Sequence, residues 1–141
     1  AQASVDETWA YVQERRAFGA PLAQYQGVSF PLAEAETQLT MMRQLCYYTL
    51  NLRDQNLPHT SEAAMCKWYL PKTCCEIIHQ CLILHGHYGY TTDLPHHQRY
   101  NDVLGLQIGD GTAQIQKLVI AREKVGRVAL QYDKKSQGAA K

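Results

Sequence analysis

The feature that most constrains the fold is a stripe of apolar side chains that recurs at steps of three and four residues in the first half of the chain. Its members are Val28, Leu32, Ala35, Leu39, Met42, Cys46 and Thr49. An α-helix turns once in about 3.6 residues, so these side chains share one face, which a long helix can bury. We therefore predict a helix over residues 22–54, in which Pro31 causes a bend or marks the true start.

The same spacing predicts a first helix near the start of the chain. Val5, Trp9 and Val12 would face inwards, and the helix should run to about Arg16. The Gly19-Ala20-Pro21 sequence then breaks it.

A third helix is predicted over residues 62–85, because a polar loop precedes it and two glycines follow it. Thr60 or Ser61 offers its N-cap, since a hydroxyl oxygen can accept a hydrogen bond from a free backbone N–H of the first turn. Pro71 should kink the helix because proline lacks the N–H that the helix needs.

The last part of the chain predicts two more helices, a short one over residues 97–104 and a final one from residue 113 to about residue 132. Five residues would form the inward face of the final helix: Ile115, Leu118, Val119, Arg122 and Val125. No segment shows the sustained alternation of a strand. We therefore expect an all-α fold, an antiparallel four-helix up-and-down bundle, with one domain over residues 1–132 and a disordered tail over residues 133–141.

The charge balance excludes some classes of partner. Fourteen Lys and Arg stand against thirteen Asp and Glu, so no one-signed field favours nucleic acid, and no apolar run approaches the length of a membrane span. The start of the chain has no signal-peptide pattern, which favours a soluble protein of the bacterial cytoplasm or the mitochondrial matrix. It also lacks an initiator Met, which suggests a processed chain or a piece of a longer one.

Cysteines and histidines are interpreted as structural. The five cysteines are odd in number and form no C-x-x-C pair, so we expect small buried thiols and no disulfide framework. Four histidines gather around one loop, at positions 85, 87, 96 and 97. A metal site normally needs three or four convergent ligands, so we predict no metal and take these as solvent-exposed loop histidines.

Three short sequences become informative when they are taken together. They are Arg-Arg-Ala-Phe-Gly-Ala-Pro-Leu at 15–22, Leu-His-Gly-His-Tyr-Gly-Tyr at 84–90 and Gly-Asp-Gly-Thr-Ala-Gln-Ile-Gln at 109–116. In this order and at this spacing, with Ala-Ala-Met-Cys-Lys at 63–67 between them, they resemble the carboxy-terminal helical domain of the acyl-CoA dehydrogenase family. The resemblance covers nearly the whole chain and implies an FAD-dependent enzyme.

The first of these sequences holds candidate flavin contacts. Arg15 lies at a helix end before a glycine break, where its guanidinium could bind a diphosphate with two hydrogen bonds, or could simply complement the helix dipole. The resemblance implies that Arg15, Phe18 and Gln26 contact the FAD of a neighbouring subunit.

The second sequence resembles the family's glycine-rich turn, which approaches the dinucleotide of FAD. Gly86 keeps the first glycine, but His87 stands where a second glycine is usual and Ile83 where a glutamine is usual. A helix C-cap would explain the glycines equally well. We keep Ile83, Gly86 and His87 as candidate cofactor contacts on the strength of the resemblance.

The third sequence holds the candidate catalytic residue. Asp110 lies between two glycines just before a helix, where an ordinary N-cap is the plain alternative. The resemblance implies that Asp110 is the general base that removes the α-proton, that Gly111 contacts the substrate, and that Thr112 and Gln114 contact the flavin.

Two departures from the family pattern bear on the substrate. Most relatives carry Glu at the base position, so Asp110 reaches one carbon–carbon bond less, about 1.5 Å. Gly109 replaces a common aromatic residue and would widen the acyl pocket. These changes favour a bulky or alicyclic acyl group. They also leave open a nitroalkane-oxidase-like enzyme, which Lys117 disfavours because those oxidases carry an arginine there.

The resemblance thus implies an acyl-CoA dehydrogenase that introduces an α,β double bond into an acyl-CoA thioester. Electrons would pass from FAD to an electron-transferring flavoprotein or a similar acceptor, and the enzyme would be a homotetramer. The competing class is a non-catalytic helical assembly module of the same fold.

Overall fold

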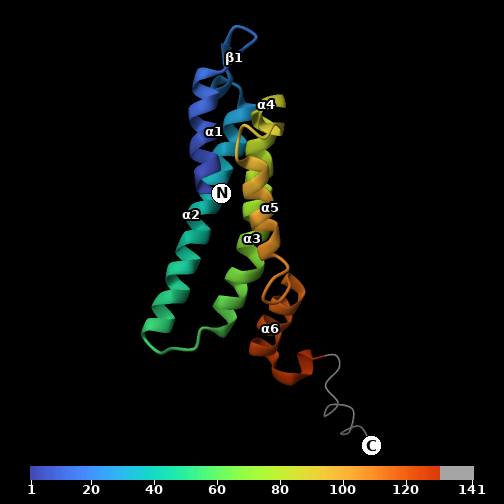
Figure 1. The fold of residues 1–141 in the computed structure, drawn as a ribbon. Coiled ribbons are helices and arrows are strands. Elements are labelled where there is room, and N and C mark those ends of the chain that lie inside the picture. The colour runs from blue at the N-terminus through green and yellow to red at the C-terminus, as the bar shows by residue number, and fades with distance from the viewer. Residues whose placement is uncertain (131–141) are drawn as a thin grey trace, which may run out of the picture.

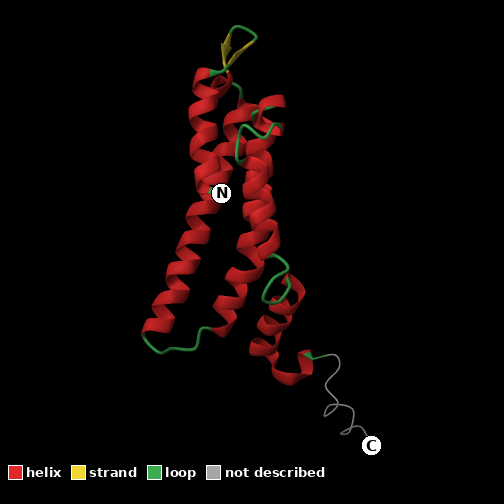
Figure 2. Ribbon diagram, in the orientation of Figure 1, coloured by secondary structure: helices red, strands yellow, loops and turns green. Residues whose placement is uncertain are grey.

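The computed structural model describes residues 1–130, and helices make up most of the described chain (Figures 1 and 2). Its longer helices are α1 (Gln2–Glu14), α2 (Gln26–Asp54), α3 (Thr60–Leu84), α5 (His96–Leu106) and α6 (Ala113–Val125). The short elements are strands β1 (Arg16–Ala17) and β2 (Ala20–Pro21), the 3₁₀ turns η1 (Leu22–Gln24) and η2 (Gly126–Ala129), and the single-turn helix α4 (His87–Tyr90).

The helix α3 is the centre of the arrangement, because every other long helix packs against it. α1 and α2 pack on α3 and on each other, while α5 and α6 follow one another along α3 (Figure 1). α1 has 13 residues and α2 has 29, so α1 can cover only about half of the length of α2. The structure confirms the predicted helical class. The regular four-helix arrangement stays a prediction, because α5 and α6 follow one another along α3 instead of forming one continuous fourth helix.

The core lies where α1, α2 and α3 meet. It contains Val5 and Val12 of α1, Ile77 and Cys81 of α3, and four residues of the predicted stripe of α2, Leu32, Ala35, Leu39 and Met42. In that stripe Leu32, Ala35, Leu39, Met42 and Thr49 are buried, and Val28 and Cys46 are half-buried. The periodicity of the sequence therefore identified the inward face of α2 correctly.

Several predicted helix ends are corrected by the structure. α1 ends at Glu14, and a two-residue antiparallel pair, Arg16 with Pro21 and Ala17 with Ala20, follows it. α2 begins at Gln26, after the turn η1, and contains Pro31 in its interior. The N-cap of α3 is His59, and neither Thr60 nor Ser61 caps it.

The last helix differs most from its prediction. α6 ends at Val125 with Gly126 at a φ of +74°, a conformation that favours glycine and stops a helix. None of its residues is buried: Ile115 is 51% exposed and Val125 61%. The predicted inward face is therefore wrong for this chain: four of its five residues are exposed, Val119 is half-buried, and α6 packs chiefly on α3. The predicted tail over residues 133–141 lies outside the described residues.

Candidate functional site

A cavity of about 540 Å³ lies where the end of α1 meets the end of α3. Its walls come from Tyr11, Arg15, Ala17 and Leu22 on one side and from residues 83–88 on the other. Arg15 is the C-cap of α1: its N–H donates to the carbonyl of Tyr11, and its own carbonyl accepts from the N–H of Leu22. The structure thus brings together four of the predicted cofactor contacts, Arg15, Ile83, Gly86 and His87.

The Gly86 turn forms the far wall of this cavity. Gly86 has a φ of +62° and ends α3, and open space surrounds the position that a Cβ would take. Gly89, in contrast, is buried in α4, where a Cβ would lie 2.3 Å from the carbonyl oxygen of Leu82. Both glycines are therefore required by the backbone, one by its conformation and one by close packing. His87 is exposed at the rim.

Phe18 stands at the tip of the β1–β2 hairpin beside the cavity. The residue is 98% exposed, and its φ is +49°, a conformation that only a few per cent of non-glycine residues adopt. Arg16 donates to the carbonyl of Gly19 at 2.9 Å, and the hydroxyl of Tyr25 donates to the carbonyl of Ala17 at 2.8 Å. Two side chains therefore hold the hairpin so that it presents an aromatic ring to the outside.

Tyr11 is a wall residue that the motifs did not identify. Its ring stacks on His85 with 4.2 Å between centroids, and its hydroxyl donates to the carbonyl of His85 at 3.5 Å. His85 in turn places Nδ1 2.9 Å from the carbonyl oxygen of Cys81. Tyr11 precedes Arg15 by one helical turn, so the helical period could have placed it on the same face.

Two of the four loop histidines are not exposed, against our prediction. His85 is 5% exposed and His96 is fully buried, while His87 and His97 face solvent. His96 opens α5 and lies between the ring of His85, at 4.6 Å, and the hydroxyl of Ser4, 3.3 Å from Nδ1. Its Nε2 has no partner among the described residues. Burial, above all, lowers the pKa of His96 to about 4.

This buried imidazole predicts a loss of stability in mild acid. The folded pKa is about 4, whereas the usual value is 6.5, so between these limits the unfolded chain binds more protons and the free energy of unfolding falls as pH falls. The loss should approach about 3 kcal/mol near pH 4. Urea unfolding followed by circular dichroism at pH 7, 5 and 4 measures it. His96→Gln should remove this part of the pH dependence, and the exposed neighbour provides the control, His97→Gln, which should retain it.

The candidate base lies on the loop between α5 and α6. Asp110 is exposed and has a φ of +54°, and Gly111 follows with +97°. Asp110 is not the N-cap of α6: that position belongs to Thr112, which makes no side-chain capping bond. The plain capping interpretation is therefore wrong, and the carboxylate of Asp110 makes no hydrogen bond or ion pair within the described residues.

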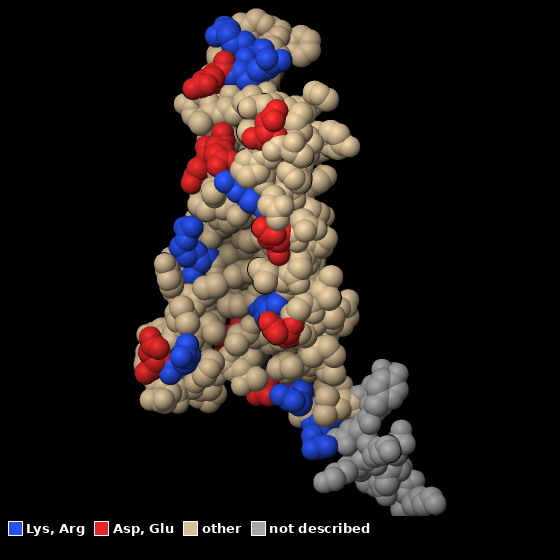
Figure 3. All heavy atoms as spheres, viewed as in Figure 1, with Lys and Arg blue, Asp and Glu red and all other residues tan. Residues whose placement is uncertain are grey.

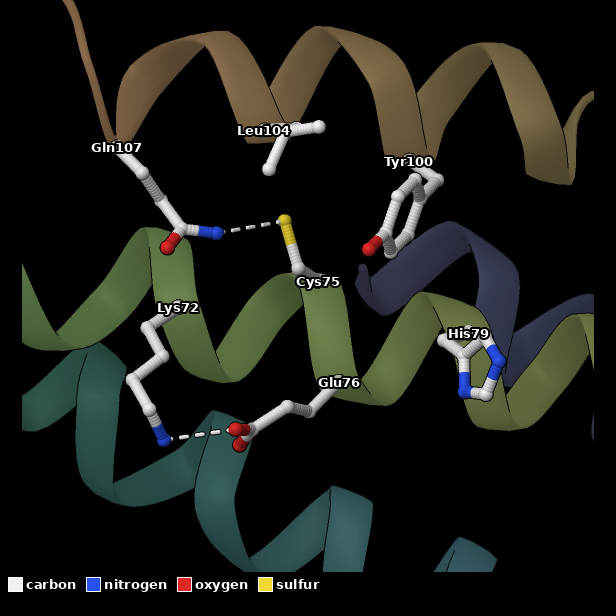
Figure 4. Close-up of a pocket in the computed structure, with 7 residues that line it drawn as sticks. All are labelled: Lys72, Cys75, Glu76, His79, Tyr100, Leu104 and Gln107. Carbon is white, nitrogen blue, oxygen red and sulfur yellow. Dashed lines mark hydrogen bonds and ion pairs between the residues drawn. The ribbon is translucent and has the colours of Figure 1, made fainter.

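Side chains tie the α5 end of this loop to α3. On the α5 side, Gln107 donates to the sulfur of Cys75 at 3.2 Å. Figure 4 shows this contact in a second cavity, of about 410 Å³, between α3 and α5, where Lys72 and Glu76 also form an ion pair. The ammonium group of Lys67 donates to the carbonyl of Leu106 at 2.6 Å. The end of α5 is thus fixed to α3 just before the loop that carries Asp110.

The predicted site residues form two clusters rather than one. The first, which we call the turn cluster, contains Arg15, Ile83, Gly86 and His87, with Phe18 beside it. The second, the base loop, contains the consecutive residues 110–112 and Gln114. The 11 residues of α5 separate the two in the chain, roughly 16 Å of helix, and Figure 1 places them at different levels. Gln26, at the start of α2, lines neither.

The remaining groups do not suggest other chemistry. Within residues 1–130, no three His, Cys, Asp or Glu side chains gather in a way that could hold a metal ion. The five cysteines are free, and burial raises the pKa of the Cys81 thiol. Charges of both signs are interspersed on the face drawn in Figure 3. None of the described helices combines the length and the apolar character that crossing a membrane requires.

Comparison with known proteins identifies the family. The family described as "Acyl-CoA dehydrogenase, C-terminal domain" matches residues 1–125. The chain therefore belongs to the acyl-CoA dehydrogenase family, of which it represents the C-terminal domain.

Individual relatives agree with this assignment. The chain is 39% identical over 121 residues to the mitochondrial short-chain specific acyl-CoA dehydrogenase of Rattus norvegicus, covering 86% of this chain and 29% of that protein. It is 36% identical over 127 residues to the acryloyl-CoA reductase (NADH) of Anaerotignum propionicum, covering 90% and 32%. The structure of butyryl-CoA dehydrogenase from Megasphaera elsdenii superposes with a TM-score of 0.84 at 27% identity, covering 87% of this chain and 32% of that one. The chain thus spans about a third of the length of these relatives.

Proposed function

We propose that this chain is the carboxy-terminal part of an FAD-dependent enzyme that acts on the α,β carbon–carbon bond of an acyl-CoA thioester. The observation that carries the proposal is the conformation of Asp110, an exposed carboxylate with left-handed backbone, no internal partner and no capping role. Backbone strain of this kind costs about 1–3 kcal/mol and clusters at active sites. A non-catalytic assembly module would not need an exposed carboxylate in this backbone conformation.

The turn cluster has the chemistry that an FAD contact requires. The guanidinium of Arg15 makes no hydrogen bond or ion pair within the described residues and lines a cavity whose opposite wall includes Ile83. A free guanidinium suits a diphosphate, because its planar fork can donate two parallel hydrogen bonds. The exposed ring of Phe18 offers a stacking surface nearby. These residues, with Gly86 and His87, would hold the dinucleotide part of a flavin.

In the proposed reaction Asp110 handles the proton. Its carboxylate would accept the α-proton of the thioester while the β-hydrogen leaves with its electron pair, and FAD supplies the acceptor for that hydride. In the opposite direction the same group, once protonated, returns the proton to the α-carbon. One relative is a reductase by name and another a dehydrogenase, so the fold serves both directions.

The shape of the base loop supports a bulky or alicyclic acyl group. Asp110 is short, and Gly109 leaves open space: a Cβ added there would meet only the carbonyl oxygen of Gly105, at 3.5 Å. The substrate would have to approach the base closely, and the missing side chain at Gly109 gives a broad acyl group room to do so.

We further propose assembly into a homotetramer. The exposed apolar side chains support this, since single chains rarely leave such surface uncovered. They include Met41, Tyr47, Leu106, Ile108, Ile115 and Val125. Electrons would leave through an electron-transferring flavoprotein or a similar acceptor, in the bacterial cytoplasm or the mitochondrial matrix.

A spectroscopic assay of the natural full-length protein tests the proposed function. Purified protein should carry FAD, and anaerobic addition of an acyl-CoA should bleach its absorbance. A panel of straight-chain, branched and alicyclic acyl-CoAs with a dye acceptor should rank the broad acyl groups above slim ones of equal carbon number. A flavin-free protein, or one that no acyl-CoA or enoyl-CoA reduces or reoxidises, would count against the proposal.

A further inference from the structure

The side chain of Gln116 in α6 reaches back to Asp110 and Gly111. Its amide nitrogen Nε2 lies 3.4 Å from the carbonyl oxygen of Asp110 and 3.4 Å from that of Gly111. Each contact is long, but the same NH₂ group serves both oxygens and has two N–H donors to do so.

The carbonyls of Asp110 and Gly111 both face the amide of Gln116 because the two residues have an uncommon backbone conformation. Asp110 and Gly111 are consecutive residues with φ of +54° and +97°. Asparagine and aspartate adopt the left-handed region more readily than other non-glycine residues, yet the conformation still costs free energy. Something outside the two residues must favour it, and Gln116 is placed to do this.

Packing agrees with these hydrogen bonds. A Cβ built on Gly111 would lie 2.7 Å from Nε2 of Gln116 and 3.8 Å from Cγ2 of Ile115. The amide therefore occupies the space that any larger residue at Gly111 would need. Glycine is favoured here by its φ of +97°, and a larger residue would also have to displace the end of the Gln116 side chain.

The other end of the loop is already fixed. Gln107 and Lys67 hold the end of α5 against α3, as described above, at 3.2 Å and 2.6 Å. The residues between these anchors and α6 can still rotate about their backbone bonds, and the glycines at 109 and 111 make that rotation easy. A restraint on the α6 side would limit this rotation.

We infer that Gln116 is a positioning residue for the base: its side-chain amide holds Asp110 and Gly111 in the left-handed conformation and so directs the carboxylate at the substrate. The inference rests on the proposed function, in which Asp110 removes the α-proton. Gln116 itself touches no reacting atom. Its loss should therefore affect the rate of proton transfer, and not the binding of flavin or thioester.

The test compares Gln116→Met, which keeps the length but removes the donor, with Gln116→His, which keeps a ring N–H donor at similar reach. In the full-length protein, stopped-flow flavin reduction by the best acyl-CoA should fall about 10- to 100-fold in the Met variant, as expected for a displacement of up to ~1 Å. Flavin content and the apparent Kd of the thioester should not change. The His variant should recover part of the rate. Gln98→Met on the exposed face of α5 is the matched control and should react normally.

A double-mutant cycle separates this inference from the proposed function. If Gln116 acts through the base, Gln116→Met should slow reduction in the parent protein and add nothing in the Asp110→Asn background. A fast Asp110→Asn variant would refute the proposed base. A slow Asp110→Asn variant together with a fast Gln116→Met variant would overturn the positioning role alone. Equal loss from Gln116→Met in both backgrounds, or loss of flavin in the Met and His variants alike, would assign Gln116 to stability and also overturn it.

Discussion

Replacing Asp110 by Asn in the full-length protein is expected to slow flavin reduction by an acyl-CoA by about 100- to 10,000-fold. The amide keeps the size of the carboxylate but cannot accept the α-proton. Because Asp110 is exposed and caps no helix, the fold and the flavin content should not change. Single-turnover stopped-flow measurements report the chemical step directly, and flavin absorbance per chain reports binding.

Asp110→Glu supplies the contrasting variant. It lengthens the side chain by about 1.5 Å and should shift preference towards slim, straight acyl groups, because the carboxylate would then occupy part of the space beside Gly109. The ratio of kcat/KM for an alicyclic and a straight-chain acyl-CoA measures this shift. Rapid reduction by the Asn variant would place the base outside residues 109–112, and the substrate argument built on Gly109 would then lose its basis.

Replacing Arg15 by Gln is expected to weaken FAD binding by about 10- to 100-fold. A hydrogen bond to a charged group contributes about 1.5–3 kcal/mol, and the guanidinium of Arg15 lines the cavity with no internal partner to satisfy it. Arg15→Lys should recover only part of the affinity, since an ammonium group cannot offer the planar pair of donors. Flavin titration of the apoprotein by fluorescence gives the two Kd values.

The control for this series is Arg53→Gln. Arg53 is an exposed arginine in the last turn of α2, far along the helix from the turn cluster. Its replacement changes the net charge equally, so it separates a local contact from a general electrostatic effect. Equal affinities of the Arg15 and Arg53 variants would assign Arg15 to the other sequence-based interpretation, in which it complements the dipole of α1.

The sequence predicted a helix well where its apolar residues recur with a clear helical period. The stripe from Val28 to Thr49 was strong because every third or fourth residue is apolar, and the structure buries its centre. The β1–β2 pair was missed because two residues per strand cannot show alternation. For α6 the period predicted an inward face that this chain leaves largely exposed, because spacing alone does not show what packs against a helix.

The candidate site was predictable only in part for similar reasons. Resemblance located Arg15 and Asp110, and the structure adds that they belong to different clusters. Gln116 lies six and five residues beyond the carbonyls that it contacts, a spacing that matches no helical or strand rule. Burial of His96 depends on the packing of α5 against α1 and α3, which local sequence does not encode. Such contacts follow from tertiary structure alone.

The separation of the two clusters by α5 has an evolutionary consequence. Substitutions at sites more than about 7–10 Å apart that share no partner usually have additive effects. Substitutions in the glycine-rich turn, such as those at Ile83 and His87, can therefore be accepted during evolution without a compensating change at Asp110. In the proposed enzyme, changes at the glycine-rich turn and changes at Asp110 can then accumulate independently of one another.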